Sequence, residues 1–140
     1  VGTVAVLGTI GTVRLGLYDT RLRGRGVTTV ATTENAQESI STAIRAVPHG
    51  LKHQSVVPSD SAIDNVIGAV DSAVESGADT VILGCTELPF VLRSERARHA
   101  LSLRSVYVVD PTTLLARALV EFVAPEKLVA GEWFVSSPNA

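Results

Sequence analysis

The 140-residue sequence has a single cysteine, few aromatic residues and no long apolar segment. One cysteine cannot form an internal disulfide, which is consistent with a reducing compartment. No apolar stretch approaches the roughly 18 residues that a membrane span needs, and no signal peptide is recognisable. We therefore expect a soluble, cytoplasmic protein without membrane contacts. The chain opens directly on a strand-like segment, so we also expect a piece of a longer polypeptide.

The chain also lacks a strong net charge of either sign. Charged residues make up 19% of the chain and the formal net charge is −2, which gives no reason to expect a nucleic-acid partner. Four arginines gather between residues 14 and 25, a short run that is typical of a solvated surface. The Gly-x-Gly-x-x-Gly spacing of dinucleotide-binding loops and the lysine of phosphate-binding loops are absent from the sequence.

Apolar runs alternate with helix-like patterns along the chain. Short runs rich in β-branched residues predict buried strands at residues 4–7, 27–30, 81–83 and 106–109. Helical spacing of apolar residues predicts helices at residues 13–22, 36–47, 59–76, 88–100 and 111–122. Strands that alternate with helices form parallel sheets through right-handed crossovers. The sequence therefore predicts an α/β fold, a parallel-sheet domain of three layers.

The strand at residues 81–83 leads into Gly84-Cys85-Thr86-Glu87, the strongest functional candidate in the sequence. Open α/β sheets bind ligands at the carboxyl ends of their strands, which is where Cys85 would lie. Backbone N–H groups at the start of a following helix would lower the pKa of this thiol from about 8.5 towards neutrality. Two alternatives stay open: Cys85 could simply fill core space, and Glu87 could be a solvated carboxylate.

A second candidate follows the first strand, in the turn Gly8-Thr9-Ile10-Gly11-Thr12. Its amides and hydroxyls are suited to hold an anion, and Thr12 could cap the next helix. The alternative is a close strand-to-helix turn in which the glycines serve only the backbone.

Residues 77–89, Gly-Ala-Asp-Thr-Val-Ile-Leu-Gly-Cys-Thr-Glu-Leu-Pro, closely resemble the second catalytic motif of the aspartate/glutamate racemase superfamily. The Cys-Thr-Glu form resembles its aspartate racemase branch, and residues 7–12, followed by Gly16 and Tyr18, resemble the opening of the second domain of those enzymes. The resemblance implies the carboxyl-terminal half of a two-domain fold. Residues 1–105 would form the second domain, residues 106–124 a strand and helix returning to the first domain, and residues 125–140 a tail.

The resemblance also implies a reaction. In the family, two cysteines on opposite faces of the substrate move a proton at the α-carbon of an acidic amino acid, without pyridoxal phosphate or a metal. Cys85 would be one of the two, and neither a cofactor nor a metal is expected. The implied substrate-binding residues are Thr9, Gly11, Thr12, Thr86 and Glu87. The expected ligand is aspartate, glutamate or another small carboxylate.

Two parts of the sequence bear on how complete this site is. The family has a lysine near the end of the helix at 36–47, where this chain has Pro48 and His49, with Lys52 just beyond. Asp110, before the last helix, is either an N-cap or a site residue, and its position favours the cap.

The first cysteine of the family is missing, which leaves four interpretations open. The chain could be half of a racemase that needs another domain or chain. It could be a homodimer that pairs two Cys85 thiols across a two-fold axis. It could be a single-cysteine decarboxylase or another one-base relative. Finally, it could be a non-catalytic ligand-binding or assembly domain.

Overall fold

A computed structural model describes residues 2–53 and 57–129 of the chain. Within these ranges four parallel strands form one sheet in the order β2-β1-β3-β4. The strands are β1 (Thr3–Leu7), β2 (Thr28–Val30), β3 (Thr80–Leu83) and β4 (Tyr107–Val109). The predicted parallel α/β fold is confirmed, and each strand lies close to its predicted position. The chain runs from β1 to β2 and then crosses to β3 on the other side, so the topological switch point lies between β1 and β3.

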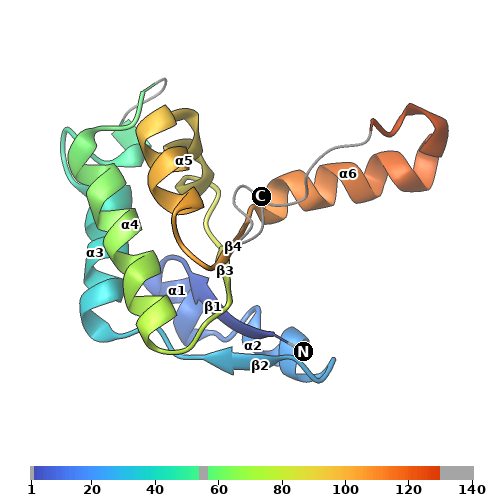
Figure 1. The fold of residues 1–140 in the computed structure, drawn as a ribbon, viewed down its shortest axis with the longest axis horizontal. Helices are drawn as coiled ribbons and strands as arrows, with labels where there is room; N and C mark the ends of the chain where they lie inside the picture. The colour runs from blue at the N-terminus through green and yellow to red at the C-terminus, as the bar shows by residue number, and fades with distance from the viewer. Residues whose placement is uncertain (1, 54–56, 130–140) are drawn as a thin grey trace.

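The core lies between one face of the sheet and two long helices, α3 (Glu34–Arg45) and α4 (Asp60–Glu75), which pack against each other (Figure 1). Paired residues of parallel strands point to the same face, so Ala5, Val81 and Val108 form one buried row towards these helices. The helices contribute the buried residues Ala36, Ile40, Ala43, Ile44, Ala62, Ile63, Val66, Ala69, Val70 and Ala73. Burying one such branched aliphatic side chain stabilises the fold by roughly 1.5–3 kcal/mol.

Polar side chains cap the starts of the helices. Each of α1 (Ile10–Arg14), α3, α4, α5 (Glu95–Ser102) and α6 (Pro111–Val123) follows a residue whose side-chain oxygen accepts a hydrogen bond from a backbone N–H of the first turn. These N-caps are Thr9, Thr33, Ser59, Ser94 and Asp110. The interpretation of Asp110 as a cap is thus confirmed. The prediction for the first helix is corrected, because Thr9 rather than Thr12 caps it.

The single helix predicted for residues 13–22 is wrong, because the structure has two short helices there. The first, α1, ends at Arg14, and α2 (Asp19–Arg23) begins only after a turn. Gly16 lies in this turn with φ +58, a left-handed conformation that residues with a Cβ rarely adopt. The left-handed glycine therefore interrupts the helical periodicity that the apolar spacing suggested.

The helix predicted for residues 88–100 is also divided. A short 3₁₀ helix, η2 (Leu88–Arg93), comes first, and α5 follows it. Ser94 separates them with an extended backbone, φ −80 and ψ 127, and accepts a hydrogen bond from the N–H of Ala97. A capping serine at this point both ends one helix and starts the next.

The last helix, α6, extends away from the sheet and from the other helices (Figure 1). None of its residues is buried, and its main packing is with the short η3 (Pro125–Lys127) that follows. Leu115, Leu119 and Phe122 are 62%, 56% and 87% exposed. The predicted tail also contains an apolar segment, Trp133-Phe134-Val135, which lies outside the described residues. A helix with this much exposed apolar surface is typical of a contact site for another surface.

Candidate active site

Two glycines bring the segments that follow β1 and β3 into contact. The N–H of Gly84 donates a hydrogen bond of 2.7 Å to the carbonyl of Leu7. A Cβ on Gly84 would lie 3.2 Å from Cε2 of Tyr18, and a Cβ on Gly8 would lie 3.2 Å from the side chain of Thr12 and 3.3 Å from the Gly84 carbonyl oxygen. The threonine-rich turn and the Cys-Thr-Glu motif therefore meet at the carboxyl edge of the sheet, at its switch point.

Cys85 is half-buried at this edge, and its thiol is hydrogen-bonded to a carboxylate. Its Sγ donates a hydrogen bond of 2.8 Å to Oε2 of Glu87. The hydroxyl of Thr86 donates to the same oxygen at 3.1 Å. The thiol packs against the core on one side but is not sealed within it, so a small molecule can approach the sulfur.

The pKa of Cys85 is raised, which corrects the prediction of a lowered value. Burial of the thiol is the largest cause, and the hydrogen bond to Glu87 adds to it by stabilising the protonated form. The backbone N–H of Glu87 and the ammonium of Lys52 do lower the pKa, but these effects are outweighed. Cys85 is therefore a neutral thiol at neutral pH.

Glu87 is ionised in this arrangement. The hydrogen bond from Cys85 is the main cause that lowers its pKa, and burial opposes it. Its own backbone N–H, the Thr86 hydroxyl and the charge of Lys52 lower the pKa further. The pair thus consists of a protonated sulfur donor and a charged oxygen acceptor.

Lys52 lies within electrostatic reach of both members of this pair, since it lowers the pKa of each. It belongs to the 3₁₀ helix η1 (Leu51–His53), which lies between the predicted helices at residues 36–47 and 59–76. Gly50 precedes η1 in a turn so tight that a Cβ there would lie 2.6 Å from the Ala46 nitrogen. The turn brings a cation towards the thiol, although the family's lysine position is not kept.

Tyr18, which lies within the helix predicted for residues 13–22, was not among the predicted site residues, yet it lies beside Cys85. Because Gly16 breaks that helix, the Tyr18 ring packs beside Gly84 and forms one wall of a cavity of about 300 Å³, the Cys85 cavity. The other lining residues are Leu83, Gly84, Cys85, Thr86, Pro111, Thr112 and Leu115. Burial is the main cause that raises the pKa of Tyr18, and the charges of Cys85 and Asp110 add to it. A glycine inside a helix-like segment was the signal that could have found this turn.

The predicted substrate-binding residues occupy two adjoining places. Thr9 and Thr12 hold each other in the turn after β1, their hydroxyl oxygens 3.1 Å apart, with Gly11 between them. Thr86 lines the Cys85 cavity, and Glu87 holds the thiol.

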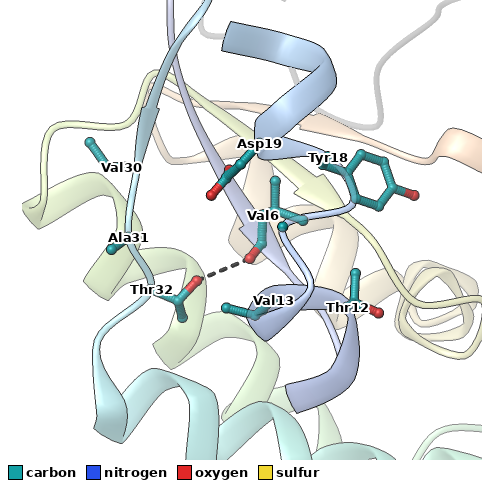
Figure 2. Close-up of a pocket in the computed structure, with 9 residues that line it drawn as sticks. Val6, Thr12, Val13, Tyr18, Asp19, Val30, Ala31 and Thr32 are labelled. Carbon is teal, nitrogen blue, oxygen red and sulfur yellow. Dashed lines mark hydrogen bonds between the residues drawn. The ribbon is translucent and has the colours of Figure 1, made fainter.

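A second cavity of about 240 Å³, the β1–β2 cavity, opens beside this turn (Figure 2). Thr12 and Tyr18 line it together with Asp19 and Thr32, and the Thr32 hydroxyl donates to the carbonyl of Val6 at 3.0 Å. Figure 2 shows the Tyr18 ring extending away from Asp19 and Thr32. Tyr18 lines both the β1–β2 cavity and the Cys85 cavity.

Within residues 2–53 and 57–129, no three His, Cys, Asp or Glu side chains come together as a metal site would require. No helix in those ranges combines the length and the apolar character of a membrane span.

These features define a class of protein: a parallel α/β domain with a thiol–carboxylate pair at the carboxyl end of a central strand. A sequence model described as "Asp/Glu/Hydantoin racemase" matches residues 1–119. The chain belongs to this family.

Solved structures agree with that assignment. A protein from Yersinia pestis assigned to the Asp/Glu racemases superimposes with a TM-score of 0.67 at 21% sequence identity, over 87% of this chain and 48% of the other. The aspartate racemase of Picrophilus torridus superimposes with a TM-score of 0.60 at 26% identity, over 85% of this chain and 44% of the other. The chain thus spans about half the length of these relatives. No curated protein sequence matches it.

Proposed function

We propose that this chain carries one half of a cofactor-independent amino-acid racemase site, in which Cys85 transfers a proton at the α-carbon of aspartate or glutamate. The observation that carries the proposal is the hydrogen bond from the Cys85 thiol to Glu87 at the carboxyl end of β3. Membership of the Asp/Glu/Hydantoin racemase family and similarity to an aspartate racemase support it.

The protonation state of the pair gives each residue a role. Because the pKa of Cys85 is raised, the resting thiol is an acid. In one direction its S–H proton is transferred to the α-carbon of an enolate, whose electron pair forms the new C–H bond and leaves a thiolate. In the other direction the thiolate removes the α-proton and becomes a thiol again. Glu87 orients the S–H and makes the thiolate a stronger base by repelling its charge.

Binding of the substrate needs donors for its carboxylate groups. In the proposal, Thr9, Gly11, Thr12 and Thr86 provide hydroxyl and backbone donors, because they meet at the edge where the thiol lies. Lys52 supplies the cation for a second carboxylate, in place of the family's lysine. Such preorganised donors stabilise the charge that develops in an enolate, which is the larger part of catalysis at such a carbon.

A racemase needs a second proton-transfer group on the opposite face of the α-carbon. Cys85 is the only cysteine of the chain, and the chain spans about half of its structural relatives. We therefore propose that a second domain or a second protomer completes the site.

Solvent exchange of the α-proton tests this function. Aspartate and glutamate are incubated in heavy water with the chain at increasing concentration, and loss of the α-proton signal is followed by NMR. We expect exchange by the native chain that is lost in the Cys85→Ser variant. If two protomers complete the site, the rate rises more steeply than in proportion to concentration. Absence of exchange at every concentration contradicts completion of the site by a second protomer, and equal exchange by the variant contradicts the role of Cys85.

A second candidate function is a one-base reaction such as decarboxylation, in which a single group protonates the enolate left by loss of carbon dioxide. The protonated resting state of the lone Cys85 favours it, because such a reaction needs only a proton donor. Release of carbon dioxide from a small dicarboxylate, lost in Cys85→Ser and without α-proton exchange of aspartate, would support this candidate over the racemase.

A further inference from the structure

We propose that Tyr18 is a substrate-binding residue of the Cys85 cavity, and that its phenol O–H donates a hydrogen bond to the carboxylate next to the reacting carbon. This inference deepens the proposed function and depends on the part of it that places a carboxylate beside Cys85.

The backbone fixes where the ring lies. Gly16, at φ +58, ends the first helical segment, so Tyr18 enters α2 from a turn rather than from a helix face. The Cε2 atom of Tyr18 lies 3.2 Å from the position that a Cβ at residue 84 would occupy, so a side chain at that residue would crowd the ring. The ring therefore packs directly against the residue that precedes Cys85, in the wall of the same cavity.

The cavity needs a neutral donor at this wall. Oxygens of Glu87 already accept hydrogen bonds from Cys85 and Thr86. The carboxylate of Asp110 accepts from the backbone N–H of Thr112 and from the hydroxyl of Thr113. The carboxylates of Glu87 and Asp110 would repel the carboxylate of a substrate, unless a hydrogen-bond donor lies between the substrate and these two residues.

The phenol of Tyr18 meets this need. No hydrogen bond of its O–H is found within residues 2–53 and 57–129. Its pKa is raised, mainly by burial, so the phenol keeps its proton at neutral pH. Tyr18 lines the cavity that holds the thiol, and its neutral O–H is a donor for which a bound carboxylate would supply an acceptor.

Alkylation of Cys85 tests the inference without requiring turnover. Iodoacetate and iodoacetamide react identically: the sulfur displaces iodide, a C–S bond forms as the C–I bond breaks, and the thiol proton goes to solvent. Iodoacetate carries its carboxylate on the reacting carbon, as a substrate does, whereas iodoacetamide is neutral. The rate constants of both reagents are measured by mass spectrometry at one pH for the native chain, Tyr18→Phe and Tyr107→Phe.

We expect Tyr18→Phe to lower the rate with iodoacetate by about tenfold to a hundredfold, the effect of one hydrogen bond to a charged group. The rate with iodoacetamide should stay unchanged, because the ring that packs on Gly84 is retained. Tyr107→Phe, which removes a phenol at the amino end of β4, should change neither rate. An equal change with both reagents, or none with iodoacetate, would overturn the inference. Alkylation does not require racemisation. The result for Tyr18 therefore stands whether or not the racemase proposal is correct.

Discussion

At the scale of the residue, two charges act on the Cys85 thiol in opposite directions. Glu87 accepts the S–H hydrogen bond and would repel a thiolate, so it raises the pKa of Cys85. Lys52 attracts a thiolate and lowers the pKa. The proton affinity of the sulfur is thus set by a balance in which burial and the carboxylate prevail. Each charge can be removed separately by a substitution of similar size.

Glu87→Gln should lower the pKa of Cys85. An amide oxygen still accepts a hydrogen bond, but it carries no charge to disfavour the thiolate. The midpoint of the pH profile for alkylation by iodoacetamide should move to lower pH, and the reaction at neutral pH should become faster. Glu75→Gln, at the exposed end of α4, is the control. A midpoint that stays in place or rises would contradict the role given to Glu87.

Lys52→Met should have the opposite effect and raise the pKa of Cys85. Without the ammonium, the thiolate loses its nearby cation, so the same alkylation profile should move to higher pH. Lys127→Met, which removes a lysine in η3, provides the matched control. If both variants give the native profile, Lys52 does not reach the thiol in solution.

At the scale of the element, Gly16 has a conformation that other residues adopt only at a cost. Gly16→Ala should destabilise the fold by about 1–2 kcal/mol, because a Cβ at φ +58 contacts the following carbonyl. Gly68→Ala, in the middle of α4 with open space around the new Cβ, should stabilise it by about 0.5–1 kcal/mol. Urea unfolding followed by circular dichroism measures both. Equal effects of the two substitutions would show that the turn is not left-handed.

Some elements were predictable from the sequence because their signals are local. The strands follow from short β-branched runs, and α4 follows from Ser59 before a regular apolar stripe. The break at Gly16 was missed because Leu15, Tyr18 and Leu22 keep an apolar spacing of three and four residues across it, and the break at Ser94 was missed because its capping role was not recognised. There the backbone conformation of one residue prevails over the periodicity of its neighbours.

The sequence was sufficient to predict the main residues of the site, but not the direction in which the pKa of Cys85 is shifted. The sequence indicates Cys85 at a strand end and a threonine-rich turn after another strand, and parallel strands bring such segments to one edge. The sign of the pKa shift depends on burial and on where the carboxylate of Glu87 points, which spacing does not determine. Tyr18 and Lys52 join the site through turns whose geometry is fixed by Gly16 and Gly50.

At the scale of the whole molecule, α6 connects the site to an exposed surface. Its first turns provide Pro111, Thr112 and Leu115 to the Cys85 cavity. Leu119 and Phe122 continue the same side of the helix at spacings of four and three residues, and both are exposed. A surface that covers this stripe would therefore also cover the cavity, which is what a second domain or protomer must do in the proposed function.

Leu119→Glu should weaken the assembly that completes the site. A charge in the middle of the stripe opposes burial of that surface, so α-proton exchange should fall at least tenfold at a given protein concentration. The fold should be unaffected, with a free energy of unfolding within about 0.5 kcal/mol of the native value, because α6 has no buried residues.

Leu103→Glu is the matched control for this prediction, since Leu103 is 73% exposed at the end of α5. Exchange and sedimentation velocity are measured for both variants beside the native chain. Equal effects of the two substitutions, or none from Leu119→Glu, would mean that the stripe on α6 takes no part in completing the site.

The hydrogen bond from the Gly84 amide to Leu7 makes the site and the sheet edge a single unit of local unfolding. That amide can exchange its hydrogen with solvent only when the ends of β1 and β3 separate, and the same opening moves the sulfur away from the threonines. The protection factor of one backbone amide would thus report the fraction of time during which the reactive geometry exists.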